Sequence, residues 1–469
     1  MKQRIHVPEY LYLVFILLLA GFFAFYKLGM HPLAEFDESR NGVNAMEMLQ
    51  HGHWLQLHYA GVPDTWNNKP PLLIWSIIAS FKFFGVNALA LRIPAALFIL
   101  LSVLYSFKIC TLYRSAKFAF WACLLLIPIG GFIGTHTGRT ADFEAPLIGF
   151  LLGSTYYYLK YLDFGNKKGI FFTALFLGLA FLSKGPAMAI FIPGLILYTV
   201  LRGKFRSVVF DWKIYAALVL VALFPILYYY ELSFQQLDGS QQLNRLVFHD
   251  VVERFTNQNF ESPQSDAGYL FFFIFLDSYF NLWNYLFYLI LAIGITQTIR
   301  QKISIKSLPK HPLLLLALCM WSTQVLFFTF AATTHRWYLA PILPFITITT
   351  MYGVFIFLRK PVFQSLILVL LLFSFGRRFQ QINNPAPAPE FIRQNCTAFQ
   401  SLDGIVIIGH PPRQNILLDL YFCQENISYI QNSELSTLVQ EPGKGYLTSR
   451  ENREQIIKIQ PDSVRFFYY

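Results

Sequence analysis

Acidic and basic side chains lie close together in the first long polar interval of the chain. Asp37 and Glu38 are followed by Arg40, and Lys69 precedes a pair of prolines. Charged side chains beside a lipid bilayer cost free energy unless they face water, a partner or a substrate. A carboxylate near a cation in a partly dry cleft suits an anionic substrate and a reaction that needs a base. This interval is therefore the first candidate for an active site.

The same kinds of side chain recur where later apolar segments end. The whole set is Asp37, Glu38, Arg40, Lys69, Asp142, Glu144, Lys184, His335 and Arg336. In this set Asp37 could deprotonate an acceptor hydroxyl. Lys69, Lys184 and Arg336 could neutralise a phosphate group. Their recurrence at one predicted membrane face favours a functional interpretation of the set.

Each member also has a structural interpretation. Acids favour helix N-termini, so Asp37 and Glu38 could simply begin a surface helix near Ser39. Lys184 could extend to the lipid headgroups, although the Gly185-Pro186 pair that follows favours a deliberate helix break.

Residues in the later segments leave similar alternatives open. Arg139, Asp142 and Glu144 could form a structural ion-pair turn, and His335 fits a structural role better than a metal-binding one. No metal-ligand spacing emerges from the histidines of the first interval, which are His51, His53 and His58. The proposed chemistry requires no cofactor, and a divalent metal is compatible with the sequence but not indicated by it.

The composition identifies an integral membrane protein. Of the 469 residues, 55% are hydrophobic and only 13% are charged, and apolar runs of membrane-spanning length recur along the chain. The first run, from Tyr10 to Tyr26, is too long for a signal peptide and lacks a small-residue cleavage site, so a retained helix is expected.

The net charge of +11 arises from one set of polar intervals. These intervals lie near residues 2–9, 108–117, 160–168, 202–213, 300–310 and 359–360. They hold 18 Lys and Arg against three acids, an excess larger than the whole net charge. This is the positive-inside bias of a multispanning protein and not a nucleic-acid-binding surface. We therefore expect a multi-pass membrane protein with a cytoplasmic N-terminus.

The expected fold class is an all-α polytopic membrane protein with about eleven spans and a small C-terminal α/β domain. The spans are predicted at 10–28, 88–108, 117–135, 145–161, 169–183, 186–202, 213–230, 282–299, 312–332, 337–358 and 362–376. Leu72 to Phe84 is short for a span, and counting it would reverse the side of Lys108, Arg114 and Lys117. It is therefore expected to be an interfacial helix of the first outer loop.

The domain plan follows from these spans. Residues 1–376 form the membrane domain, with outer loops at 29–87 and 231–281 and an outer surface segment from Tyr269 to Phe280. Residues 377–389 are expected to be a stiff linker, because its end is rich in proline. Residues 390–469 are expected to fold as a periplasmic α/β domain.

Two segments support an α/β tail. Residues 404–409 read as a buried strand, and Asn415 to Phe422 as a helix or a second strand. Cys396 and Cys423 lie in this tail, where a disulfide is possible but open. The other three cysteines lie in or beside apolar segments, where inert packing is expected.

An ordered series of motifs resembles a known family. Phe36-Asp37-Glu38-x-Arg40 comes first, followed by Ala45-Met46-Glu47-Met48, Gly52-x-Trp54 and Lys69-Pro70-Pro71-Leu72 with Trp75. Arg139 to Leu147, Leu182 to Pro186, Glu253-Arg254-Phe255 and Arg336 to Pro344 follow in order. The series, over about residues 10–358, resembles the GT-C membrane glycosyltransferases of the protein mannosyltransferase and aminoarabinose (ArnT-like) transferase type, families 39 and 83.

The resemblance implies an inverting transfer of one sugar from a polyprenyl-phosphate donor, on the periplasmic side of the membrane. The acceptor would be an envelope molecule, such as a lipid A-like glycolipid, a protein or a polymer. The implied catalytic residues are Asp37, Glu144 and Asp142. The implied substrate-binding residues are Glu38, Arg40, Lys69, Arg139, Lys184, His335, Arg336 and Tyr338.

One position departs from the family. The aminoarabinose transferases carry an acid immediately before the Lys-Pro pair, and this chain has Asn68 there. A metal-binding or amino-sugar-binding role at this position is therefore not implied.

Two other classes of function compete with the enzyme. A transporter or lipid flippase would place charges near span midpoints and show inverted repeats, and the sequence shows neither. A non-catalytic assembly or receptor subunit would tolerate the loss of both Asp37 and Glu144.

Overall fold

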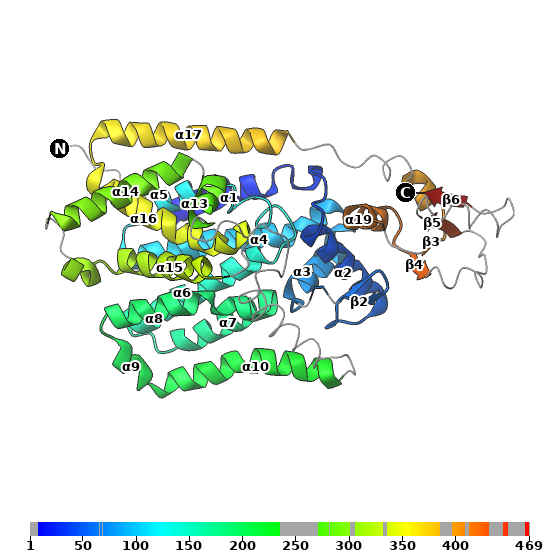
Figure 1. Cartoon of the computed structure of the whole chain (residues 1–469), viewed down its shortest axis with the longest axis horizontal. Helices are drawn as coiled ribbons and strands as arrows, with labels where there is room; N and C mark the ends of the chain where they lie inside the picture. The colour runs from blue at the N-terminus through cyan, green and yellow to red at the C-terminus, as the bar shows by residue number, and fades with distance from the viewer. Residues whose placement is uncertain are drawn as a thin grey trace. The chain divides into compact units, whose positions relative to one another are not determined.

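The computed structural model describes residues 8–64, 66–67, 69–234, 271–280, 282–300, 305–331, 335–384, 396–408, 412–430, 444–448 and 465–468 (Figure 1). Contacts between Cα atoms divide the chain into two compact units. The helical unit comprises Met1–Tyr26, Ala95–Arg139 and Phe143–Asn383. The loop–sheet unit comprises Lys27–Pro94, Thr140–Asp142 and Asn384–Tyr469. The predicted motif Glu253-Arg254-Phe255, Asn68 and residues 385–389 of the predicted linker lie outside the described residues. Residues 377–383, also predicted as linker, are helical instead.

Long apolar helices build the helical unit. They are α1 (Glu9–Phe25), α4 (Ala88–Tyr113), α5 (Ala116–Leu126), α6 (Glu144–Phe164), α7 (Gly169–Lys184), α8 (Ile192–Leu201), α10 (Trp212–Phe234), α14 (Leu282–Ile299), α15 (Pro312–Thr329), α16 (Leu343–Phe357) and α17 (Pro361–Asn383). Shorter pieces are α9 (Phe205–Val209), α13 (Phe271–Tyr279) and the 3₁₀ segments η2 (Gly185–Phe191), η5 (Ile305–Lys310) and η6 (Arg336–Ile342).

Burial separates the central helices of this unit from its flanks. In the most apolar part of the stretch Arg336–Phe357, which contains α16, 89% of the residues are buried. In the corresponding parts of α10 and α17 only 11% of the residues are buried. In Figure 1, α17 and α10 accordingly run along opposite edges of the unit. Exposed leucines on α10 and α17, such as Leu227 and Leu372, present the apolar surface that a lipid environment requires.

Eight helical stretches in the described residues are long and apolar enough to cross a membrane. They confirm a polytopic helical fold, whereas the predicted count of eleven spans stays a prediction. Predicted spans 169–183 and 186–202 form one continuous apolar stretch, Gly169–Leu201, which bends at η2. α17 continues to Asn383, beyond the predicted span end at residue 376.

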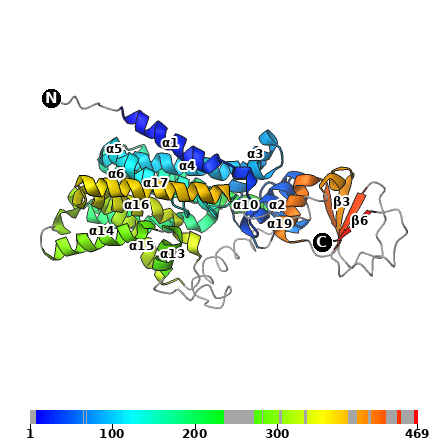
Figure 2. The same ribbon diagram turned by 90° about the horizontal axis from the view of Figure 1, so that it is seen from above.

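The C-terminal end of α1 packs against the end of α17 through aromatic rings. Phe22 and Tyr26 stack on Phe379, with ring centroids 6.4 and 5.6 Å away. Figure 2 shows both helices along the same face of the unit. The first and last long helices of the helical unit therefore pack against each other at these ends.

Several of the predicted cation-rich intervals meet at one end of the helical unit. The Asp163 carboxylate, near the end of α6, accepts hydrogen bonds from Tyr113 of α4 (2.6 Å) and Lys204 (2.8 Å). Arg202 donates to the Pro309 carbonyl, and Tyr352 contacts His311 at 2.9 Å. The intervals that the sequence assigns to one membrane side are thus joined in space.

The loop–sheet unit begins with helices of the first polar interval. Its elements are η1 (Leu28–Met30), α2 (Asp37–His51), the short antiparallel pair β1 (His58–Tyr59) and β2 (Val62–Pro63), and α3 (Leu72–Phe84). α3 is a short apolar helix that packs against α2, in agreement with the predicted helix at Leu72 to Phe84. α4 begins in this unit and continues into the helical unit.

The tail contributes a parallel sheet to the same unit. β3 (Gly404–Ile408) is buried throughout and pairs with β4 (Ile427–Ile430) and β5 (Lys444–Thr448), and β6 (Arg465–Tyr468) extends the sheet in the order β4-β3-β5-β6. α19 (Gln414–Cys423) connects β3 to β4, as parallel pairing requires. The predicted strand is confirmed, and the segment left open between helix and strand is a helix.

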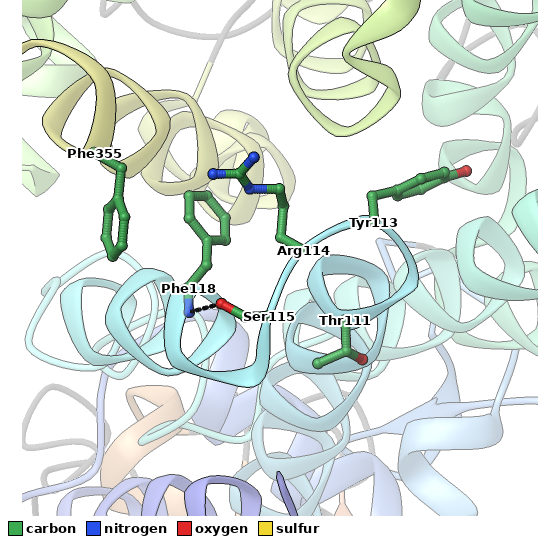
Figure 3. A pocket seen from close by; sticks show the side chains of 6 residues that line it. All are labelled: Thr111, Tyr113, Arg114, Ser115, Phe118 and Phe355. Carbon is green, nitrogen blue, oxygen red and sulfur yellow. Dashed lines mark hydrogen bonds between the residues drawn. The ribbon is translucent and has the colours of Figure 1, made fainter. Parts of the chain in front are cut away.

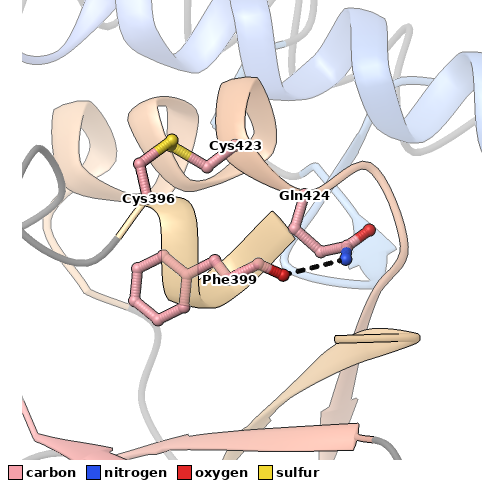
Figure 4. The surroundings of a disulfide bond; sticks show 4 residues. All are labelled: Cys396, Phe399, Cys423 and Gln424. Carbon is pink, nitrogen blue, oxygen red and sulfur yellow. Dashed lines mark hydrogen bonds between the residues drawn. A yellow bond between two sulfur atoms is a disulfide. The ribbon is translucent and has the colours of Figure 1, made fainter. Parts of the chain in front are cut away.

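A disulfide joins Cys396 to Cys423 at the end of α19 (Figure 4). Next to it, the Gln424 side-chain amide donates to the carbonyl oxygens of Phe399 (3.2 Å) and Leu402 (2.7 Å). The pairing that the sequence left open is therefore present. The three other cysteines are free and buried, as expected.

Candidate active site

Asp37 is the first residue of α2 and follows a strained residue. Phe36 has φ 69°, a conformation that a bulky side chain adopts at a cost, and its ring is exposed. The acids Asp37 and Glu38 both fall in the first turn, where the helix dipole stabilises negative charge. The structural role considered from the sequence, that these acids begin a helix, is thus present in the fold.

Asp37 lies beside a second carboxylate. Carboxylate oxygens of Asp37 and Asp142 are within 4.8 Å of each other, and both residues belong to the loop–sheet unit. Asp142 is buried, and its carboxylate accepts a hydrogen bond from the Thr140 hydroxyl. Carboxylate oxygens this close can be ligands of one divalent cation. The sequence placed these two acids in one set, and the structure brings them together.

Glu38 is used differently from its neighbour. Its buried carboxylate accepts two hydrogen bonds from the Arg92 guanidinium, at 2.6 and 2.8 Å. The amides of Ala34 (2.8 Å) and Ala141 (3.2 Å) also donate to it. Glu38 therefore ties the start of α2 to α4 and to the segment that carries Asp142.

Sequence reasoning did not single out Arg92. This guanidinium is fully buried and also donates to the carbonyls of Leu28, His31 and Pro32, each at 2.9 Å. A lone arginine inside an apolar run is rare without a partner, so its position was the signal that could have found it.

Arg40 forms a second ion pair in the loop–sheet unit. Its guanidinium donates to both Asp64 oxygens, at 2.8 and 2.7 Å, and lies 4.3 Å from the Tyr59 ring centroid. Burial acts to raise the pKa of Asp64, but the hydrogen bonds and charge of Arg40 outweigh it and lower that pKa. Burial also raises the pKa of Tyr59 to about 12. Asp64 was missed from the sequence because nothing local distinguishes it from an ordinary turn residue.

Asparagines complete the packing of this region. The Asn44 side chain donates to Asp64 (2.9 Å), and the Asn67 side chain donates to Asn41 (3.0 Å) and Asn44 (2.9 Å). Lys69 follows two residues later and is half-buried just before α3 begins. Asp64 and Asn67 are thus held by side chains of α2.

Glu47 is a further buried acid that the sequence did not assign. It accepts hydrogen bonds from the hydroxyls of Tyr421 (3.1 Å) and Tyr429 (3.0 Å) in the tail. The amides of Ala60 (2.8 Å) and Gly61 (3.0 Å) donate to the same carboxylate. Burial raises the pKa of Glu47, although these hydrogen bonds oppose that effect. α2 is therefore the element on which the tail packs.

The helical unit holds another acid–base pair of the predicted set. Glu144 begins α6 and Lys184 ends α7, and the Lys184 ammonium donates to the Glu144 carboxylate. Gly185 follows with φ 57° and ψ −132°, a conformation that favours glycine, and Pro186 then starts η2. The predicted helix break is confirmed, and it leaves Lys184 at the end of its helix.

Aromatic residues extend this pair into a row. The Lys184 ammonium lies 5.0 Å from the Tyr338 ring centroid, and Tyr338 contacts His335 at 5.1 Å. Trp337 stacks between His335 (4.7 Å) and His136 (3.8 Å). The structure thus brings together Glu144, Lys184, His335 and Tyr338, whereas the side chain of Arg336 is exposed.

Arg139 has a different environment from Lys184. It is buried, and its guanidinium donates to the carbonyls of Phe23 (2.7 Å), Ala24 (3.2 Å) and Tyr26 (3.0 Å) at the end of α1. These contacts satisfy the last carbonyls of that helix. The structure shows this role for Arg139, and substrate binding there stays a prediction.

The three histidines of the first interval gather without a defined ligand geometry. The ring of His58 lies 5.8 Å from that of His51 and 5.1 Å from that of His53. Burial lowers the pKa of His58, and the two neighbouring histidines act in the same direction.

The fold and these paired charges define a class. The chain has the fold of the GT-C membrane glycosyltransferases, as shown by its similarity to ArnT from Cupriavidus metallidurans bound to undecaprenyl phosphate. That comparison covers 96% of each chain with a TM-score of 0.69 and 14% sequence identity. An oligosaccharyltransferase from Archaeoglobus fulgidus is also similar, with a TM-score of 0.51 and 11% identity over 89% of this chain and 63% of that one.

Sequence comparisons lead to particular relatives. The family model described as dolichyl-phosphate-mannose-protein mannosyltransferase matches residues 68–229. An undecaprenyl phosphate-α-4-amino-4-deoxy-L-arabinose arabinosyl transferase of Pseudomonas savastanoi pv. phaseolicola is 34% identical over 124 residues, or 26% of this chain and 23% of the relative. An uncharacterized protein of Aquifex aeolicus is 29% identical over 200 residues, or 42% and 39%.

These findings confirm the resemblance drawn from the motifs. The chain matches less than half of the length of each of the two curated relatives. None of these similar proteins is named as a transporter, the alternative considered from the sequence.

Proposed function

We propose that this protein is an inverting glycosyltransferase that moves one sugar from a polyprenyl-phosphate donor to an acceptor of the cell envelope. The name of the Pseudomonas relative, which specifies an undecaprenyl-phosphate sugar, and the mannosyltransferase family model support this class of donor. The acceptor class is a glycolipid, a protein or a polymer. The reaction takes place on the periplasmic side, with the N-terminus in the cytoplasm and the tail in the periplasm, as the charge distribution predicts.

The observation that carries the proposal is the pair of carboxylates formed by Asp37, at the start of α2, and Asp142. Asp37 takes the proton of the acceptor hydroxyl, whose oxygen forms a bond to the anomeric carbon of the sugar. The bond from that carbon to the phosphate oxygen breaks, and the polyprenyl phosphate leaves. Asp142, with a carboxylate oxygen within 4.8 Å of one of Asp37, is the second acid at this position.

The cations of the predicted set are assigned to the bound substrates. Lys184 and Arg336 supply positive charge that stabilises the leaving phosphate, and Lys69 and Arg40 are assigned to substrate binding. Glu144 sets the position of the Lys184 ammonium through their ion pair.

The remaining predicted residues have supporting roles. The aromatic row of His335 and Tyr338 provides flat surfaces for a sugar or prenyl group beside Lys184. Glu38 and Arg139 act by positioning, because their polar atoms contact Arg92 and the end of α1.

Transfer by the purified chain in lipid nanodiscs tests the proposal. A panel of polyprenyl-phosphate hexoses and pentoses is offered with envelope glycolipids and proteins, and release of polyprenyl phosphate is measured. The Asp37→Asn variant should lose about 10²–10⁴-fold in rate, the usual contribution of a general base. The exposed neighbour Glu35 provides the matched control, and Glu35→Gln should keep the wild-type rate.

Two results would count against the proposal. Wild-type rates in a folded Asp37→Asn variant would remove Asp37 from the chemistry. Failure of the wild type to release polyprenyl phosphate from every donor would contradict the glycosyltransferase function itself.

A further inference from the structure

A cavity lies where α4 ends and α5 begins, among the cation-rich chain ends of the helical unit. Its volume is about 410 Å³, and it is lined by Thr111, Tyr113, Arg114, Ser115, Phe118 and Phe355 (Figure 3). The first five come from the junction of α4 and α5, and Phe355 comes from the end of α16. No part of the proposed transfer chemistry uses these residues.

Arg114 gives the cavity its charge. The side chain is exposed, and its guanidinium carbon lies 5.5 Å from the Phe118 ring centroid and 5.1 Å from that of Tyr352. Such rings attract and orient a guanidinium but leave its N–H donors available. Among the described residues no carboxylate pairs with Arg114.

Asp163 is connected to this junction through the hydroxyl of Tyr113, but its carboxylate already accepts several hydrogen bonds. Asp163 accepts from Tyr113 (2.6 Å), from Tyr198, from Lys204 (2.8 Å) and from Arg202 (3.3 Å). Four donors on one carboxylate fill its acceptor capacity. Within the part of the chain that the structure describes, the positive charge of Arg114 is therefore left for an external anion.

Neighbouring groups supply further donors and an apolar wall. The Ser115 hydroxyl oxygen accepts from the Phe118 amide at 3.4 Å, which leaves its own hydrogen to be donated. The rings of Phe118 and Phe355 lie 5.3 Å apart and form an apolar wall. A ligand with an anionic head and an apolar continuation would match both kinds of lining.

The position of the cavity indicates which class of anionic ligand it could bind. It lies at the ends of apolar helices and in the interval that also carries Lys108 and Lys117, on the side that the positive-inside bias assigns to the cytoplasm. Anionic phospholipids concentrate positive side chains at this surface.

We propose that the cavity binds the phosphate headgroup of an anionic phospholipid. The Arg114 guanidinium donates charge-assisted hydrogen bonds to two phosphate oxygens, and the Ser115 hydroxyl donates a third. The glycerol and the first methylenes of the acyl chains lie against Phe118 and Phe355.

Lipid retention by the purified full chain tests this assignment. Wild type, Arg114→Gln and Lys117→Gln proteins are equilibrated with phosphatidylglycerol or phosphatidylcholine, and bound lipid is counted by native mass spectrometry. Lys117 is exposed in the same interval but does not line the cavity, so it reports general surface electrostatics. Inorganic phosphate is tested as a competitor, because a free anion would present the same oxygens.

The wild type should retain phosphatidylglycerol over phosphatidylcholine, and Arg114→Gln should lower retention about tenfold or more, because it removes charge-assisted hydrogen bonds as well as a charge. Lys117→Gln should lower retention about fivefold or less, the effect of one cation at a membrane surface. Phosphatidylglycerol should raise the melting temperature of the wild type but not of Arg114→Gln. Equal losses in the two variants, no lipid preference in the wild type, or displacement of the lipid by millimolar inorganic phosphate would each overturn the proposal.

Discussion

Among single residues, Lys184 and Glu144 show how strongly one side chain depends on another. Their side chains are 14% and 5% exposed, so both charges are largely removed from water. Removal of the ammonium in Lys184→Met leaves Glu144 without its partner, which we expect to destabilise the folded state by about 3–5 kcal/mol. A lower melting temperature in detergent is the measurement.

Two variants separate this effect from a general loss of charge. Lys167 is exposed, and Lys167→Met should leave the melting temperature unchanged. Adding Glu144→Gln to Lys184→Met should restore much of the stability but not the transfer rate. If the double variant is as unstable as Lys184→Met alone, the ion pair is not the cause.

The lowered pKa of Asp64, again a property of one residue, predicts how the stability of the folded protein depends on pH. Because its pKa lies below the ordinary value of 3.8 in the folded protein, its ionised form stabilises the fold at neutral pH. That stabilisation is present above pH 3.8 and is lost as the pH falls through the lower folded value. Glu47 has a raised pKa and therefore acts in the opposite direction, with its stabilisation lost as the pH rises above its ordinary value of 4.5.

Thermal unfolding between pH 2 and pH 7 measures how much Asp64 contributes to the stability of the folded protein. The wild type should lose stability steeply below about pH 4, near the unperturbed Asp pKa, and Asp64→Asn should flatten that loss while lowering stability at pH 7. An unchanged acid limb in Asp64→Asn would show that the pair with Arg40 does not govern it.

At the scale of elements, the end of α7 depends on one glycine. Gly185 has φ 57° and ψ −132°, a sparsely populated backbone region where a residue with a Cβ atom costs about 1–3 kcal/mol, and it fixes the direction of the chain immediately after Lys184. Gly185→Ala should therefore lower both the melting temperature and the transfer rate. Gly21→Ala is the matched control, because a Cβ at Gly21, within the helix α1, meets no atom within 4 Å.

The control should be neutral or slightly stabilising, since alanine is the better helix former. A Gly185→Ala protein with wild-type stability and rate would mean that the break does not position Lys184.

In α2 the structure differs most from the sequence-based prediction in the partners that it gives to the charged side chains. The acids of α2 at positions 37 and 38 were predicted as a catalytic and a substrate-binding residue of one site, yet Asp37 lies beside Asp142 and Glu38 is bound to Arg92. Alternate faces of one helix turn meet different neighbours, so adjacency in sequence does not imply a shared environment. Gly42 on the same helix allows Leu418 of the tail to approach, since a Cβ there would lie 2.4 Å from that side chain.

At the scale of the whole molecule, cysteine accessibility tests the topology. Cys396 and Cys423 form a disulfide, whereas Cys110, Cys123 and Cys319 are buried. A membrane-impermeant maleimide added to spheroplasts should label nothing before reduction and two cysteines per chain after it. Labelling only in inverted membranes would place the tail in the cytoplasm and reverse the proposed orientation.

The double variant Cys396→Ser/Cys423→Ser is the control for this labelling. It should remain unlabelled after reduction until the protein is unfolded by detergent and heat. Labelling of folded double variant would show that a buried cysteine had become accessible.

The sequence alone determined the features that depend on local pattern. Apolar runs of membrane-spanning length, the break at Lys184-Gly185-Pro186 and the buried strand at 404–408 are all encoded by residues near one another in the chain. Their physical causes are hydropathy, glycine conformation and β-branched packing, which act over a few residues.

The tertiary structure decided the partners of the charges. Glu38 pairs with an arginine 54 positions away, and Glu47 accepts from a tyrosine 374 positions away, distances over which no local pattern carries information. A buried charge requires a partner in space, and only the folded chain determines which residue occupies that place. For this reason Asp37 could be proposed as a site residue from the sequence. The residues that hold α2 in position could be identified only from the fold.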